Sequence, residues 1–343
     1  MRISHFFFAV VLVLFAQDAL AWGSNGHATA GAIADAILAA EGKNAQAHVR
    51  RILGKIGRHQ VNLADAANWA DCAREYEMRD GKVSYVRSRF HENACDVFDN
   101  NQASRDELAA YVANNYTQCP YKNQMAECHK SYHFADIPIE ENNYRPTYFG
   151  ARQWDVVHAI DAAASWLKGQ RPAPLPFVIT TDKEALFMIA HFVGDIHQPL
   201  HVTALYLDDS GATVDARQPA NQKEQADTHG GNSLELGSRN LHGIWDATNF
   251  TAGQLALLVD EAAGYRQTGG DVTTWADAWA SDTIKEGKPA LLGFKVQAKS
   301  GDAWPIKYDD ANAYNAAKSR LQKEQIEKAG RRMADLLMAI WPN

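Results

Sequence analysis

The chain has 343 residues and a formal net charge of −7, with 13 histidines and four cysteines. Proteins that bind duplex nucleic acid tightly usually present a basic face, so this charge argues against such a binder. It still allows an enzyme that holds phosphate through bound metal ions. After the first residues, no apolar run approaches the ~20 residues that a membrane-spanning helix needs.

The first 21 residues have the features of a signal peptide. Arg2 gives a positive start, residues 6–15 form an unbroken apolar run, and Ala19-Leu20-Ala21 is a small-x-small cleavage site. An uncleaved membrane anchor is the alternative, but the apolar run is short for that role. We expect cleavage after Ala21, which makes Trp22 the first residue of a secreted or periplasmic protein.

Helical periodicity dominates the rest of the chain. We expect helices near residues 27–40, 105–116, 152–168, 183–197, 251–264, 271–283 and 310–340. Three prolines within 171–177 predict a stiff connector, and the polar stretch 208–232 predicts a long surface loop before a possible short strand at 233–236. No low-complexity linker divides the chain. The predicted fold is therefore all-α, a single compact helical domain over 22–343 with long loops and at most a short β-hairpin.

The four cysteines fall within one segment of the chain, at Cys72, Cys95, Cys119 and Cys128. An even number in an exported protein predicts two disulfides, for which three pairings are possible. Proximity in sequence favours Cys72 with Cys95 and Cys119 with Cys128. A cysteine zinc site is disfavoured because no C-x-x-C pair is present.

The strongest chemical signal is the stretch from His191 to His201. His191 and Asp195 are four residues apart and share one face of a predicted helix. Pro199 then ends the helix, so His201 can turn back toward the same region. Apolar neighbours bury this helix, and buried Asp and His side chains need partners because an unpaired charge in a core is costly.

His242 and Asp246 repeat the same spacing. One such pair is more often a hydrogen-bonded couple, but two pairs together with His201 favour a metal site. Asp71 and His133 are weaker candidates when each is taken alone.

The expected new N-terminus adds another ligand. A free α-amine has a pKa near ~8, low enough for a zinc ion to capture it in the deprotonated form. The amine and carbonyl of Trp22 could chelate one metal together with His27. Signal cleavage would then create a ligand.

As a set, these motifs resemble the zinc-dependent, single-strand-specific nucleases of moulds, plants and bacteria, the S1/P1 nuclease family. They are W-G-x-x-G-H, W-A-D, Y-H-F-x-D, H-F-x-G-D-x-x-Q-P-L-H, G-G-N and L-H-x-x-W-D, in the family's order. The resemblance covers most of the mature chain. It implies an all-α fold with three zinc ions at the base of a cleft.

The resemblance also implies which residues bind each metal. One zinc would be held by Asp71, His133, His191 and Asp195; a second by Trp22 and His27, with Asp195 bridging; and the third by His201, His242 and Asp246. Donors of this kind, without thiolate, suit hydrolytic zinc. In this scheme two bridged zincs activate a shared water and the third stabilises the departing oxygen.

Three further residues match family positions near the substrate. Arg74, close to the ligand Asp71, would neutralise phosphate charge, and these two are the expected catalytic residues. Phe134 would stack on an unpaired base and Asp136 would bind the edge of that base, which would select single strands. The alternative places Phe134 in the core and makes Asp136 a support for a zinc ligand.

The function expected from the resemblance is an endonuclease that cuts single-stranded DNA and RNA to 5′-phosphorylated products, with 3′-nucleotidase activity as a compatible addition. The alternative is a zinc phospholipase C-type phosphodiesterase, in which the first histidine lies farther from the terminal Trp and the final ligand is typically Glu. A non-catalytic zinc-binding protein is a third reading, disfavoured because a structural site closes with four ligands. We expect a monomer without a stable protein partner or a membrane anchor.

Overall fold

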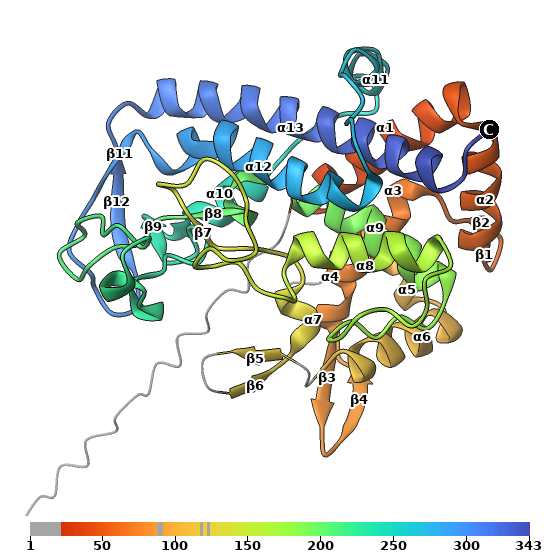
Figure 1. Ribbon diagram of the computed structural model, residues 1–343, viewed down its shortest axis with the longest axis horizontal. Coiled ribbons are helices and arrows are strands. Elements are labelled where there is room, and N and C mark those ends of the chain that lie inside the picture. The colour runs from red at the N-terminus through yellow and green to blue at the C-terminus, as the bar shows by residue number, and fades with distance from the viewer. Residues whose placement is uncertain (1–21, 88–91, 117–118, 122–123) are drawn as a thin grey trace, which may run out of the picture.

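The computed structural model describes residues 22–87, 92–116, 119–121 and 124–343. The expected signal peptide, residues 1–21, lies outside the described residues. Figure 1 shows an elongated molecule in which long helices form one side and short hairpins project from the other.

Helices account for most of the described chain. The longer ones are α1 (Ser24–Glu41), α2 (Lys43–Leu53), α6 (Gln102–Asn114), α8 (Val156–Leu167), α9 (Asp182–Asp195), α11 (Leu255–Ala263), α12 (Trp275–Gly287) and α13 (Ala311–Ile340). The short ones are α3 (Leu63–Ala66), α4 (Trp69–Cys72), α5 (Asp96–Asp99), α7 (Cys128–Ser131) and α10 (Leu241–Asp246). All seven helices expected from periodicity are present within a few residues of their bounds, and the all-α class is confirmed. Helix α2 was not expected.

Helix α9 lies at the centre of the fold. Every residue from Glu184 to Asp195 is buried, and α9 contacts α1, α2, α3, α4, α8 and α13. The side chain of Thr181 starts the helix by accepting a hydrogen bond from the backbone N–H of Glu184. A helix that is apolar on all faces is stable when it is surrounded in this way. Its polar residues His191 and Asp195 are therefore held rigidly inside the core.

The strands are short but more numerous than the single hairpin expected. They are β1 (Lys55–Ile56), β2 (His59–Gln60), β3 (Tyr76–Arg79), β4 (Lys82–Tyr85), β5 (Cys119–Tyr121), β6 (Gln124–Ala126), β7 (Ile137–Pro138), β8 (Thr203–Ala204), β9 (Leu234–Leu236), β10 (Arg239–Asn240), β11 (Phe294–Val296) and β12 (Trp304–Tyr308). Four of them form a sheet in the order β10-β9-β12-β11, in which β9 and β12 are parallel. Parallel pairing of β7 with β8 joins the segment after His133 to the segment after His201.

The disulfides are Cys72–Cys95 and Cys119–Cys128, the pairing that sequence proximity favoured. The first of them joins the end of α4 to the turn before α5. The second spans β5 and the start of α7. Within the described residues, none of the helices combines the length and the apolar character needed to cross a membrane.

Candidate metal centre

Asp195, at the end of α9, is the centre of the candidate site. Its Oδ2 lies 3.1 Å from Nε2 of His191, one turn earlier on the same helix. The chain then turns through the 3-10 helix η3 (Pro199–His201), and Nδ1 of His201 reaches 3.8 Å from Oδ1 of Asp195. The H-x-x-x-D pair and the histidine after the proline turn are thus brought together, as the spacing predicted.

A first group forms where α4 and the segment after α7 meet α9. Nδ1 of His133 lies 2.9 Å from Oδ2 of Asp195 and 3.0 Å from Nε2 of His191. Oδ1 of Asp71 lies 3.9 Å from Nδ1 of His133 and 3.8 Å from Nε2 of His191. Ligand atoms of Asp71, His133 and His191 all fall within 4.8 Å of one another. The four residues expected to share one metal therefore converge.

A second group is built on the start of α1. Nε2 of His27 lies 3.3 Å from Oδ1 of Asp195, and its ring stacks on that of His191 with centroids 4.1 Å apart. Trp22 is fully buried, and its indole N–H donates to the carbonyl of Gly194 at 3.0 Å. The next backbone N–H, that of Gly23, donates to the carbonyl of Asp246 at 2.9 Å. The expected mature N-terminus thus lies next to the candidate metal centre.

A third group joins η3 to α10. Nε2 of His201 and Nε2 of His242 are 3.0 Å apart, and Nε2 of His242 is 3.7 Å from Oδ2 of Asp246. The Nδ1 atoms face backbone carbonyls that can only accept a hydrogen bond. His201 donates to the carbonyl of His133 at 2.7 Å and His242 to that of Gly230 at 2.8 Å. A ring held in this way turns its Nε2 toward the group, the nitrogen through which it would bind a metal.

The electrostatics of the cluster fit divalent cations. Both ring nitrogens of His27, Oδ1 of Asp195 and Oδ2 of Asp246 are buried and form no hydrogen bond with any described residue. Burial and the neighbouring His191 lower the pKa of His27 to about 4, and burial and His201 lower the pKa of His242 to about 3. These rings are therefore neutral at pH 7, as metal ligands must be.

The carboxylates support the same reading. Burial raises the pKa of Asp246 well above its usual range, so its ionised form needs a nearby cation. Burial opposes ionisation of Asp195 as well, but His191 and His201 hold its pKa well below the usual range. The neutral rings of His27 and His242 beside the buried carboxylates of Asp195 and Asp246 leave donor atoms that bound cations would satisfy.

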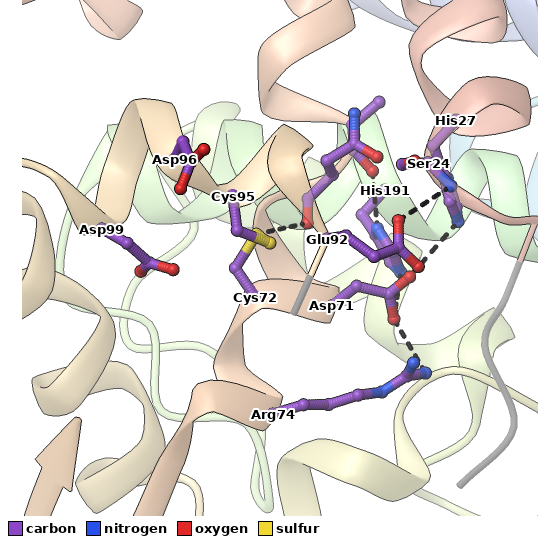
Figure 2. The surroundings of a disulfide bond; sticks show 12 residues. Ser24, His27, Asp71, Cys72, Arg74, Glu92, Cys95, Asp96, Asp99 and His191 are labelled. Atoms are coloured by element: carbon purple, nitrogen blue, oxygen red, sulfur yellow. Dashed lines mark hydrogen bonds and ion pairs between the residues drawn. A yellow bond between two sulfur atoms is a disulfide. The ribbon is translucent and has the colours of Figure 1, made fainter. Parts of the chain in front are cut away.

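The predicted substrate residues lie around this centre. A terminal nitrogen of Arg74 is 2.9 Å from Oδ1 of Asp71, and Figure 2 shows the guanidinium directed at that carboxylate. Phe134 is half-buried, whereas Asp136 is buried. Asp136 forms a further group of possible ligands with Asp227 and His229. Sequence spacing gave no reason to connect His229 with the site.

A pocket of about 380 Å³ opens beside the candidate ligands. It is lined by residues 23–25, 92–94 and 246–248. Residues from the start of α1, from the segment 92–94 and from the end of α10 therefore share one hollow next to Asp246.

Comparison with known proteins identifies the family. The S1/P1 Nuclease family model matches residues 118–342, more than half of the chain. This chain belongs to the S1/P1 nuclease family. It is 32% identical over 117 residues to Endonuclease 2 of Arabidopsis thaliana, covering 32% of this chain and 33% of that protein. It is 30% identical over 114 residues to Endonuclease 3 of the same plant, covering 33% of each. These alignments span about a third of the length of the curated relatives.

Three expected ligands lie outside the part of the chain that matches the S1/P1 nuclease family model. Trp22, His27 and Asp71 precede residue 118. The fold nevertheless brings His27 to Asp195, Asp71 to His191 and Trp22 to Gly194. The packing of the N-terminal segment therefore extends the candidate metal centre beyond the region that the family model matches.

Sequence reasoning missed the residues that hold the candidate ligands in place. Nε2 of Gln198 donates to Oδ1 of Asp246 at 2.7 Å, and its Oε1 accepts from the backbone N–H of Leu200 at 2.6 Å. Gly230 takes a φ of +57°, and a Cβ there would lie 2.0 Å from the carbonyl oxygen of Leu200. Both residues stand inside the quoted motifs. Their roles depend on partners distant in sequence.

Proposed function

We propose that residues 22–343 form one zinc-dependent nuclease domain, exported by a signal peptide at 1–21. The domain would hydrolyse single-stranded DNA and RNA to 5′-phosphorylated products and act as a monomer in the periplasm or outside the cell. Two disulfides support export, because such bonds persist in oxidising compartments. A 3′-nucleotidase activity is compatible with the same site.

The observation that carries the proposal is the convergence of three His/Asp groups around the buried Asp195. Nitrogen and oxygen donors without thiolate are the set that zinc hydrolases use. The first zinc would be held by Asp71, His133, His191 and Asp195, the second by Trp22, His27 and Asp195, and the third by His201, His242 and Asp246. Zinc bound there supplies Lewis acidity that lowers the pKa of water and offsets charge on the phosphate.

The chain's own residues prepare the site for that chemistry. Hydrogen bonds from Nδ1 to the carbonyls of Ala67, His133 and Gly230 fix the rings of His191, His201 and His242. Arg74, already paired with Asp71 at the edge of the centre, would bind a non-bridging phosphate oxygen.

Substrate choice would depend on the half-buried Phe134, next to His133. An unpaired base can lie on an aromatic face, whereas a paired base cannot easily reach it. Asp136 was expected to contact the edge of that base. Its burial favours the supporting role that was the alternative for this residue.

Substrate assays test the proposal directly. The mature protein should degrade heat-denatured DNA and RNA much faster than duplex DNA, lose this activity in a chelator and recover it with added zinc. Hydrolysis of phosphatidylcholine without cleavage of nucleic acid would establish the phospholipase alternative. Zinc binding without turnover of any of these substrates would establish a non-catalytic protein.

The N-terminal ligand has its own test. A variant with one extra residue before Trp22 displaces the α-amine and should lose most activity and one zinc. A matched control carries the same extra residue followed by a protease site, so that cleavage restores Trp22 as the first residue. Full activity of the extended variant at equal zinc loading would remove Trp22 from the proposed ligand set.

A further inference from the structure

Glu92 lies beside the candidate metal centre but outside the expected ligand set. Its Oε2 accepts a hydrogen bond from the backbone N–H of Ser24 at 3.2 Å. Figure 2 shows its carboxylate between Ser24 and His27 on one side and Asp71 on the other. Glu92 is half-buried and lines the pocket next to Asp246.

The position of Glu92 matters because Ser24 is the first residue of α1. The residue before it, Gly23, has no side chain and forms no side-chain cap. The first N–H groups of a helix have no partner within the helix and carry its positive dipole end. Glu92 supplies a charged acceptor there. The first turn of α1, which ends at His27, is therefore anchored by a residue from another part of the chain.

A disulfide ties the segment of Glu92 to the same centre. Cys95, three residues after Glu92, is bonded to Cys72, and Cys72 directly follows Asp71. The N-terminal side of the centre, with Trp22 and His27, is thus linked to Asp71 through one hydrogen bond and one covalent bond (Figure 2).

Glu92 is not one of the candidate metal ligands. Among the described residues it belongs to none of the groups of His, Cys, Asp and Glu whose ligand atoms lie within 4.8 Å of one another.

We propose that Glu92 is a positioning residue of the metal centre, which caps α1 and, through the Cys72–Cys95 disulfide, sets Trp22 and His27 relative to Asp71. The identity of the metal in this inference rests on the proposed function. The capping contact itself does not.

The test compares Glu92→Ala and Glu92→Gln with Asp96→Asn in chains that begin at Trp22. Asp96 directly follows Cys95 but lies on the far side of the disulfide from the His/Asp cluster in Figure 2, which makes it a matched control. Hydrogen exchange of residues 24–30 is measured in metal-free protein, and zinc affinity by competition with a chelator.

In Glu92→Ala we expect exchange of these amides to become about 10-fold faster, and zinc affinity to fall by ~10- to 100-fold, as for other residues that orient ligands. Glu92→Gln should lose less, because its amide oxygen still accepts from Ser24. Asp96→Asn should match the wild type in both measurements.

If the amides of Glu92→Ala exchange at the wild-type rate, the capping role is overturned. If they exchange faster but zinc affinity is unchanged, the positioning role is overturned. An equal loss in Asp96→Asn also overturns the proposal, because it would reflect general destabilisation. Failure of the proposed function is a separate result. In that case the wild type would bind zinc without cutting single strands, or would not bind zinc at all. Hydrogen exchange in metal-free protein would still test the contact between Glu92 and Ser24.

Discussion

The substitution Gly194→Ala tests the packing of the candidate metal centre most sharply. Gly194 stands directly before Asp195 in α9, and a Cβ built on it would lie 2.7 Å from Nδ1 of His27 and 3.0 Å from Cε1. Ordinary contacts begin at 3.4 Å, so the His27 ring would have to move by 3.4 − 2.7, or about 0.7 Å. The backbone of α9 is buried on all sides and has little room to shift instead.

The expected effect combines two opposing contributions. Replacing glycine by alanine inside a helix ordinarily stabilises it by ~1 kcal/mol, whereas overpacking a core costs ~1–3 kcal/mol. The free energy of unfolding should therefore fall by at most ~2 kcal/mol. Activity should fall much further, since a misplacement of ~1 Å in a catalytic centre can cost ~100-fold.

The assay measures kcat on denatured DNA, zinc affinity and Tm for Gly194→Ala. Gly269→Ala is the control, because Gly269 is exposed, has no positive φ and no atom within 4 Å of an added Cβ. We expect a loss of ~10- to 100-fold in kcat and in zinc affinity for Gly194→Ala only. Wild-type kcat and zinc affinity together with a raised Tm would refute the contact between Gly194 and His27.

Three further predictions follow from single residues. Gln198→Ala removes the hydrogen bond to Asp246 and should weaken zinc binding by ~10- to 100-fold with little change in overall fold, measured by chelator competition and circular dichroism. Phe134→Ala should reduce cleavage of single strands more than hydrolysis of a small phosphoester; equal losses would contradict base stacking. Burial and the neighbouring Lys130 lower the pKa of His129 to about 3. Between pH 6.5 and about 3, the His129 ring therefore binds a proton only in the unfolded chain. Above pH 6.5 the ring is neutral in both states, and the free energy of unfolding has its full value. As pH falls below 6.5, protonation of the unfolded chain lowers this free energy. From pH 6.5 to 5, metal-free wild type should lose ~1.5–2 kcal/mol relative to His129→Phe in denaturant unfolding; parallel pH profiles would show that His129 is not held neutral.

The local sequence pattern was sufficient to predict the elements that hold the candidate metal centre. The spacing of His191 and Asp195 within an apolar run predicted both helix α9 and a shared face, because a buried helix has a fixed period. Pro199 predicted the turn that brings His201 back. Proximity in sequence also gave the correct disulfides.

Contacts between distant segments could not be read from pattern. The hydrogen bond from Gln198 to Asp246 joins residues 48 apart, and that from Ser24 to Glu92 joins residues 68 apart. Neither pair has a spacing that marks it, because only the tertiary packing of separate segments brings the partners together. The parallel pairing of β12 with β9 also joins segments far apart in sequence and was not expected.

The proposed site explains how a protein with a negative net charge can bind a polyanionic substrate. A chain with a net charge of −7 repels polyanions at long range. The candidate centre contributes three carboxylates, Asp71, Asp195 and Asp246, and three zinc ions would add six positive charges, which leaves a local excess of +3. Arg74 at its edge adds one more. Attraction for phosphate would then exist only where the metals are bound, so loss of zinc should abolish substrate binding as well as turnover. A basic-faced nuclease, in contrast, would keep its affinity for nucleic acid after its metals were removed.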